Sequence, residues 1–304
     1  MPTLEALHAA GHDIALAITQ PDRPVGRAQE LVAPPLKQTA LAAGIPVAQP
    51  HKIRNNAEFR AQLESVQPDV IVVVAYGRII PPWMLALPRL GCINLHASLL
   101  PRYRGAAPIQ WAIAMGEEIT GNTTMLLEEG LDTGPILMQR ALIIRPGQTA
   151  LDLFEEMASG GAPLMVETLA GLANGNIRPQ PQDHSRATLA PLLQREDGLI
   201  HFAAHTATVI NNRWRGFQPW PGAFTALEGK KLIVHKMNVA ISAQFDLHVP
   251  LEPGHVVIRH ERIFAACAGN TWIELLELQL EGKKRLAAAE FLRGVHLATG
   301  VRLG

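Results

Sequence analysis

Two polar residues, Asn94 and His96, stand at the end of a short apolar segment and directly before a loop rich in Pro and Gly. Residues two apart in an extended chain point to the same side, so both side chains are expected to face one site. An Asn amide donates a hydrogen bond to a carbonyl oxygen that becomes negative, and a protonated His does the same. The pair predicts an oxyanion-stabilising site. The simpler alternative is that each side chain makes ordinary hydrogen bonds in a turn.

A second polar loop, residues 128–134, contains Asp132 and also follows a short apolar run. In α/β proteins, loops at the carboxyl ends of strands lie at the edge of the sheet where ligands bind, so the two loops can meet. A carboxylate near a histidine stabilises the charged imidazole, and it can also accept a proton from an attacking amine. Together the three side chains suit addition to a carbonyl-like centre.

The composition is that of a globular protein, with 48% hydrophobic and 18% charged residues in 304, which is enough for two domains. Lys plus Arg and Asp plus Glu each number 27, so the net charge does not indicate nucleic-acid binding, although a local basic patch remains compatible with it. Cys92 and Cys267 lack metal-ligand or redox spacing, which predicts buried thiols in a reducing cytoplasm. Without a long apolar run or a metal-ligand cluster, neither a membrane span nor a metal is expected.

The first half of the chain alternates predicted strands with predicted helices. Residues 69–75 form a continuous β-branched run, which is typical of a parallel strand buried on both faces. The alternation predicts an α/β fold with a parallel, doubly wound sheet. The other predicted strands are 14–18, 92–95 and 123–127, and the predicted helices are 4–10, 35–43, 58–66, 107–115 and 151–172.

The pattern changes after Asn174, where a stretch rich in Pro and Gln resembles a linker. Short β-like segments separated by Gly-containing turns follow, and they predict a small barrel or sandwich. We therefore expect a catalytic domain at 1–174, a linker at 175–194 and a C-terminal domain at 195–304.

Three motifs together resemble the signature of the formyltransferases that use 10-formyltetrahydrofolate. They are Asn94-x-His96-x-Ser98-Leu99-Leu100-Pro101, Arg104-Gly105-x-x-Pro108 and Gly130-Leu131-Asp132-Thr133-Gly134. The resemblance implies a Rossmann-like domain in which Asn94, His96 and Asp132 are catalytic. It also implies that the folate, as formyl donor, binds at Ser98, Leu99, Leu100 and Pro101, and that no metal is needed.

Other segments are similar to the members of this family that act on tRNA. They are residues 19–27, 73–77, 87–94, 215–223, 281–284 and 291–294. This similarity implies an open β-barrel of oligonucleotide-binding (OB) type at the C-terminus. It also implies formylation of the amino group of methionine esterified to initiator tRNA, by a monomer. Arg23, Arg27, Lys283 and Lys284 are the expected tRNA contacts.

One departure from the family pattern lies at Met1-Pro2-Thr3, which enters a helix where the family has a strand and a loop. A Rossmann-like domain without its first strand is expected to leave an unpaired edge on each side. We expect that the start codon has been wrongly assigned, downstream of the segment that encodes this strand. The alternatives are a true truncation that lowers activity and a sheet that closes up by rearrangement. Two other functions also remain open, a formyltransferase acting on a small amine and a catalytically impaired tRNA-binding homologue.

Overall fold

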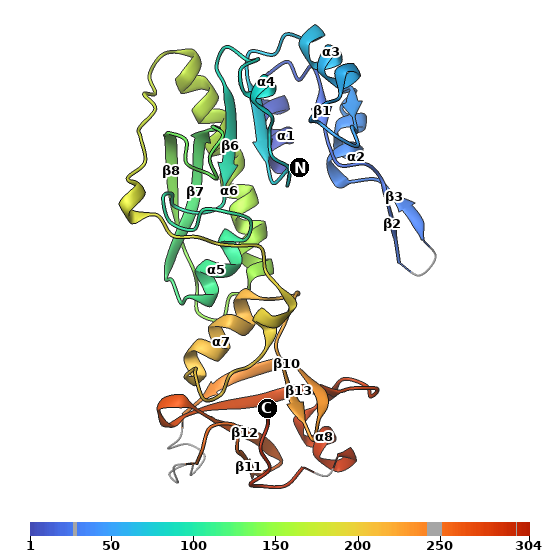
Figure 1. The fold of residues 1–304 in the computed structure, drawn as a ribbon, viewed down its shortest axis with the longest axis vertical. Coiled ribbons are helices and arrows are strands. Elements are labelled where there is room, and N and C mark those ends of the chain that lie inside the picture. The colour runs from blue at the N-terminus through green and yellow to red at the C-terminus, as the bar shows by residue number, and fades with distance from the viewer. Residues whose placement is uncertain (27–28, 242–250, 296) are drawn as a thin grey trace. The chain divides into compact units, whose positions relative to one another are not determined.

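The computed structural model describes residues 1–26, 29–241, 251–295 and 297–304 (Figure 1). By its internal contacts the chain forms two compact units, which are described separately below. Unit 1 comprises Met1–Pro108, Ile119–Ile143 and Phe154–Pro191, and unit 2 comprises Ile109–Glu118, Ile144–Leu153 and Leu192–Gly304. Most of the stretch that the sequence suggests as a linker, up to Pro191, clusters with unit 1.

The elements up to the end of the long helix α6 are, in chain order, α1 (Pro2–Ala9), β1 (Ala17–Ile18), β2 (Arg23–Val25), β3 (Glu30–Val32), α2 (Pro35–Ala42), β4 (Val47–Ala48), α3 (Ala57–Ser65), β5 (Ile71–Val74), α4 (Pro82–Leu85), β6 (Cys92–His96), α5 (Pro108–Ala114), β7 (Ile119–Leu126), β8 (Ile136–Ile143) and α6 (Ala150–Ala173). The later elements are η1 (His184–Arg186), η2 (Arg195–Gly198), α7 (Ala207–Gly216), β9 (Phe224–Leu227), β10 (Lys230–Ala240), β11 (Val256–Arg259), β12 (Arg262–Cys267), η4 (Ala268–Asn270), β13 (Thr271–Leu280), β14 (Leu286–Ala287) and α8 (Ala288–Gly294).

The main sheet of unit 1 has the strand order β5-β6-β7-β8 and is mixed. Strands β5 and β6 are parallel, whereas β7 is antiparallel to both β6 and β8. The prediction of a wholly parallel sheet is therefore wrong for its second half. For β7 and β8 the reason is the connection: a loop without a crossover helix joins them, and such a loop permits only antiparallel pairing.

Helices cover both faces of this sheet. On one face Leu7 of α1 and Leu164 of α6 pack with Ile93 of β6. On the other face Phe59 of α3 and Met84 of α4 pack with strands β5 and β6. This three-layer α/β arrangement, visible in Figure 1, is the Rossmann-like architecture that the sequence predicts.

Of the strands that precede β5, β1 and β4 form a separate parallel pair, and β2 and β3 form an antiparallel pair. Among the described strands β1 pairs only with β4 and β5 only with β6, so each has one unpaired edge. As an edge strand, β5 is not buried on both faces as predicted: Val72 and Val73 are half-buried and Val74 is 42% exposed.

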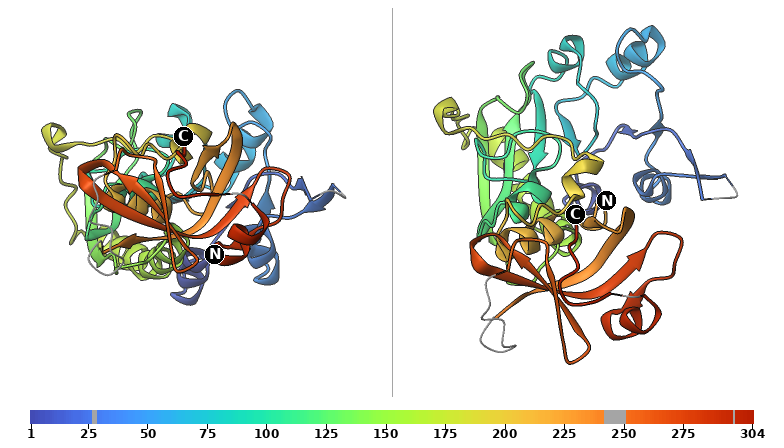
Figure 2. Two further views of the ribbon diagram at one scale, coloured as in Figure 1. Left: turned by 90° about the horizontal axis from the view of Figure 1, so that it is seen from below. Right: turned by 60° about the horizontal axis from the view of Figure 1, so that its bottom comes forward.

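Unit 2 is built on an antiparallel sheet with the order β11-β12-β13-β10-β9, in which β14 also pairs with β13. Figure 2 shows the strong bend of these orange and red strands. Strands β9 and β11 end the path, so the described strands do not close into a barrel. One continuous core, which includes Leu232, Ile263 and Phe291, lies beneath the sheet.

Both cysteines are buried, as predicted. Burial raises the pKa of Cys92 to about 12, and it raises the pKa of Cys267 to about 12 as well. At neutral pH both thiols are therefore protonated and behave as small apolar side chains. In the part of the chain that the structure describes, none of the helices has the length and apolar character needed to cross a bilayer.

Candidate active site

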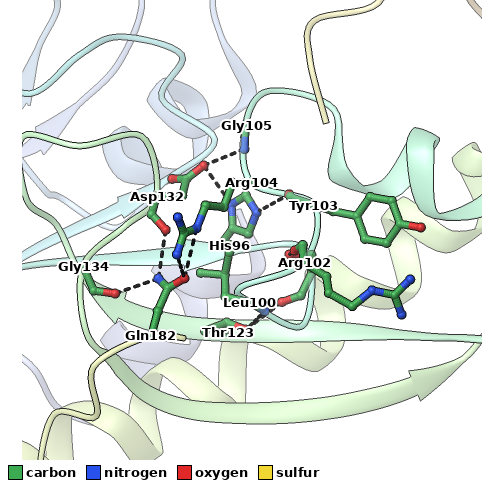
Figure 3. Close-up of polar contacts among 11 residues, drawn as sticks. His96, Leu100, Arg102, Tyr103, Arg104, Gly105, Thr123, Asp132, Gly134 and Gln182 are labelled. Atoms are coloured by element: carbon green, nitrogen blue, oxygen red, sulfur yellow. Dashed lines mark hydrogen bonds and ion pairs between the residues drawn. The ribbon is translucent and has the colours of Figure 1, made fainter. Parts of the chain in front are cut away.

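The last residue of β6, His96, is the centre of a buried polar cluster (Figure 3). Its side chain is 6% exposed, and its Nε2 lies 3.0 Å from the carbonyl oxygen of Tyr103. Because a carbonyl oxygen only accepts, Nε2 must carry the hydrogen and donate it. The other ring nitrogen, Nδ1, faces Asp132. The hydrogen bond to Tyr103 therefore selects both the tautomer and the orientation of the ring.

Asp132 reaches the same point from the loop between β7 and β8. Its Oδ2 is 3.7 Å from His96 Nδ1 and accepts a hydrogen bond of 2.8 Å from the backbone N–H of Gly105. The distance to His96 is an ion-pair distance when the ring is protonated, but it is longer than a hydrogen bond. The two polar loops singled out in the sequence thus lie together, and a backbone amide fixes the carboxylate between them.

The backbone of the Asp132 loop restricts which residues can occupy two of its positions. Asp132 itself adopts a positive φ of 49°, which few residues other than Gly tolerate. At Gly134 a Cβ atom would lie 1.9 Å from the carbonyl oxygen of Leu126, so only glycine fits. The Gly residue that closes the Gly-Leu-Asp-Thr-Gly motif is therefore required by a close approach of two backbone segments.

Asn94 precedes His96 by two residues on β6, so both side chains project from the same face of the strand. Asn94 is half-buried. Within the described ranges its side-chain amide has no hydrogen-bond partner in the protein. The amide therefore remains available to a ligand.

The segment expected to bind folate, residues 98–101, follows β6 directly. Ser98 is fully buried, and its hydroxyl donates to the carbonyl oxygen of Arg102 at 2.6 Å. The hydroxyl of Thr123 on β7 donates to the Ser98 carbonyl and accepts from the Leu100 N–H. The Leu100–Pro101 peptide bond is cis. The hydroxyl of Ser98 is thus used inside the loop, and the loop is held by its neighbour strand.

Two residues that the sequence analysis did not select complete the cluster. Arg104 and Gln182 are each 6% exposed, and the Gln182 side chain accepts from Arg104 while it donates to the Asp132 loop. Arg104 stands inside one of the family motifs, but the motif does not reveal that its charge is buried. Gln182 lies in a Pro-rich stretch without periodicity, where a polar side chain gives no signal of burial.

The expected tRNA contacts do not belong to this cluster. Arg23 is exposed on β2, which forms a hairpin with β3 where the sequence suggested a loop, and Arg27 lies outside the described residues. Lys283 and Lys284 are exposed in the turn between β13 and β14 of unit 2. In the part of the chain that the structure describes, Arg23, Lys283 and Lys284 have no carboxylate partner.

Comparison with known proteins gives a consistent result. A family model described as formyl transferase matches residues 2–169, and the model of the formyl transferase C-terminal domain matches residues 192–296. The methionyl-tRNA formyltransferase of Acidobacterium capsulatum is 62% identical over 304 residues, which cover all of this chain and 96% of that protein. The methionyl-tRNA formyltransferase of Koribacter versatilis is 53% identical, with 100% and 95% coverage.

Among solved structures, the N-formyltransferase from Helicobacter canadensis, in complex with folinic acid and dTDP-3-aminofucose, has a similar fold. The TM-score is 0.64 at 18% identity, and the match covers 90% of this chain and 93% of that one. Fold and matched regions define the class, a formyl transferase with a Rossmann-like N-terminal domain and a C-terminal domain. Within that class the chain belongs to the methionyl-tRNA formyltransferase family.

Proposed function

We propose that this chain transfers the formyl group of 10-formyltetrahydrofolate to the amino group of methionyl initiator tRNA. The observation that carries the proposal is the geometry at the end of β6, where His96 Nδ1, Asp132 Oδ2 and the Gly105 N–H lie together. The identity of 62% with a relative that bears the name of this activity supports the choice of substrate.

In the proposed mechanism the free amine of methionine attacks the formyl carbon, and a C–N bond forms. The formyl oxygen becomes negative, and the Asn94 amide stabilises it together with Nδ1–H of the protonated His96 ring, because Nε2 already donates to Tyr103. Asp132 orients His96 and takes the proton that the amine loses, directly or through a water molecule. The bond from the formyl carbon to folate N10 then breaks, and Asp132 returns the proton it took from the amine to N10, directly or through water, as tetrahydrofolate leaves. His96 and Asp132 thus act as one unit.

For the folate we propose the segment Ser98, Leu99, Leu100 and Pro101, because it continues directly from β6 beside the catalytic groups. The Helicobacter canadensis protein, which shares the fold, is in complex with folinic acid. The bonds from Thr123 keep the segment in place, so the site needs little reorganisation to receive the donor.

For the tRNA we propose that unit 2 is an OB-type domain and that Lys283 and Lys284 contact phosphates, together with Arg23 and Arg27. The support is a strongly bent antiparallel sheet of the kind that open barrels use, with exposed cations at one of its turns. Phosphate contacts of this type position an RNA without reading its sequence.

A transfer assay with alternative acceptors tests the proposal. The purified full chain is incubated with 10-formyltetrahydrofolate and one of three acceptors: methionyl initiator tRNA, the same tRNA uncharged, or a nucleotide-linked amino sugar. Formylmethionyl-tRNA should form, and the other acceptors should give no product. Product with the amino sugar alone would identify a small-amine formyltransferase. Binding of tRNA without product from any acceptor would identify a catalytically impaired homologue.

A further inference from the structure

Gln182 lies in the segment that follows the long helix α6, and its side-chain amide connects two loops of the candidate site. It lies in a polar segment, yet its side chain is buried. Its Nε2 donates to the carbonyl oxygen of Asp132 at 2.8 Å and to that of Gly134 at 2.7 Å. Its Oε1 accepts from Nη2 of Arg104 at 2.6 Å and from Nε at 3.1 Å. One amide therefore ties the Asp132 loop to the loop that follows His96 (Figure 3).

The orientation of this amide is determined by its partners. The guanidinium of Arg104 only donates, so it must face Oε1, and the two carbonyl oxygens only accept, so they must face Nε2. Arg104 also lies 3.1 Å from Nδ1 of His184, and among the described side chains no carboxylate pairs with it. A flipped amide would break all four hydrogen bonds at once.

The chain around Gln182 supports the same two loops. Thr188 accepts a hydrogen bond from the Tyr103 N–H through its hydroxyl, at 2.8 Å, and another from the Arg104 N–H through its carbonyl, at 2.8 Å. The carbonyl oxygen of Tyr103 accepts the hydrogen bond from His96 Nε2, and Tyr103 has a positive φ of 60°. A conformation of this kind persists only where surrounding contacts hold it.

We propose that Gln182 is a positioning residue for the transfer reaction, acting through Asp132; the proposal rests on the function proposed above. The two bonds from Nε2 fix the carbonyl groups of Asp132 and Gly134 and so hold the loop in which Asp132 has a positive φ. Without them the loop relaxes, and the carboxylate leaves its place between Gly105 and His96. A displacement of about 1 Å at reacting groups is enough to cost roughly 10²-fold in rate.

Two variants separate the interactions of Gln182. Gln182→Glu keeps an acceptor for Arg104 but turns an oxygen toward the carbonyls of Asp132 and Gly134, so only the hydrogen bonds to the Asp132 loop are removed. Gln182→Met removes the hydrogen bonds on both sides. Gln180→Glu is the matched control, because Gln180 is exposed on the same segment and undergoes the same change of charge.

Two readouts are measured on the full chain. In steady-state transfer, kcat should fall about 10- to 100-fold in both Gln182 variants, while KM for tRNA and for the folate changes less than about threefold. Residue-resolved amide exchange should show faster exchange at the Gly105 N–H, since its acceptor is Asp132 Oδ2. The control should match the wild type in both readouts.

Two results would overturn the proposal: wild-type kcat in both Gln182 variants, or a lower kcat with unchanged exchange at Gly105. If Gln182→Met fails to fold, the proposal is tested by kcat and by the exchange at Gly105 in Gln182→Glu, because that variant retains the Arg104 hydrogen bonds. A wild-type chain without transfer activity would refute the proposed function. The exchange of Gly105 in Gln182→Glu would then still decide whether Gln182 holds Asp132 in place.

Discussion

Two regions of unit 1 hold their polar side chains in opposite ways. At the end of β6, His96, Asp132 and Gln182 come from three distant segments and are buried or nearly so, each with partners in the protein. In the β2–β3 hairpin, which projects from the unit in Figure 1, Arg23 is exposed, and among the described residues it interacts only through the pairing of its backbone. The groups proposed to do chemistry are thus fixed by several contacts each, whereas the side chain of Arg23, proposed to contact tRNA, is not.

The hairpin is secured at its base instead. Asp22, just before β2, pairs with Nζ of Lys37 at 2.7 Å and accepts a hydrogen bond of 2.7 Å from Gln49. The bond from Lys37, followed by that from Gln49, holds the pKa of Asp22 below its usual value. This is a solvent-accessible contact at one point, in contrast to the enclosed network around Asp132.

The largest expected effect is a loss of turnover when His96, in the buried cluster at the end of β6, is replaced. His96→Ala should lower kcat for transfer to methionyl-tRNA about 10²–10³-fold, because an oxyanion donor is typically worth that much. The melting temperature serves as the check on folding. His8→Ala, which changes an exposed histidine of α1, is the matched control and should keep wild-type kcat. Unchanged turnover in His96→Ala would remove this residue from the mechanism.

A smaller effect is expected at the hairpin base. Asp22→Asn removes the ion pair with Lys37, so KM for tRNA should rise about two- to fivefold, as for an exposed ion pair, with kcat unchanged. Asp69→Asn, which removes the exposed pair with Arg89, is the control. A drop in kcat in Asp22→Asn would contradict the separation of binding from chemistry.

The same pair predicts a pH dependence of stability. Because the pKa of Asp22 is lowered in the folded state, its contribution is complete above the usual carboxylate pKa and is lost as pH falls through the lowered value. Thermal unfolding of the wild type and Asp22→Asn should therefore differ at neutral pH and converge in acid. A difference that grows as the pH falls would have the wrong sign.

The smallest effect is expected in unit 2. Replacing Lys283 and Lys284 together by Ala should weaken tRNA binding a few-fold and reduce the slope of log K against log salt by about 0.7–0.9 for each phosphate that is no longer neutralised. Lys230→Ala, another exposed lysine of this unit, is the control. An unchanged slope would exclude the two lysines from binding phosphates.

The sequence predicted which polar residues lie together at the site better than it predicted the segments that hold them. The spacing of Asn94 and His96 and the frame around Asp132 are local signals, and they led directly to groups that the fold brings together. Strand β8 was not predicted, because the exposed Gln139 and Arg140 interrupt its apolar pattern. The role of Gln182 depends on a segment returning across the site, and no local pattern encodes such a contact.

For strand β5 the sequence predicted the strand itself but not its burial. Its β-branched run indicated correctly that a strand forms, but burial depends on which neighbours flank it. With β6 on one side and an unpaired edge on the other, Val74 remains exposed. Propensity is a property of the segment, whereas burial is a property of the whole sheet.

The central claim is that His96 and Asp132 act as one unit in formyl transfer. A double-mutant cycle on kcat tests it most directly, with His96→Ala, Asp132→Asn and the double variant assayed on methionyl initiator tRNA. If the residues act together, the double variant should be about as slow as the slower single variant. If the two losses multiply, the residues act independently and the account of this site is wrong.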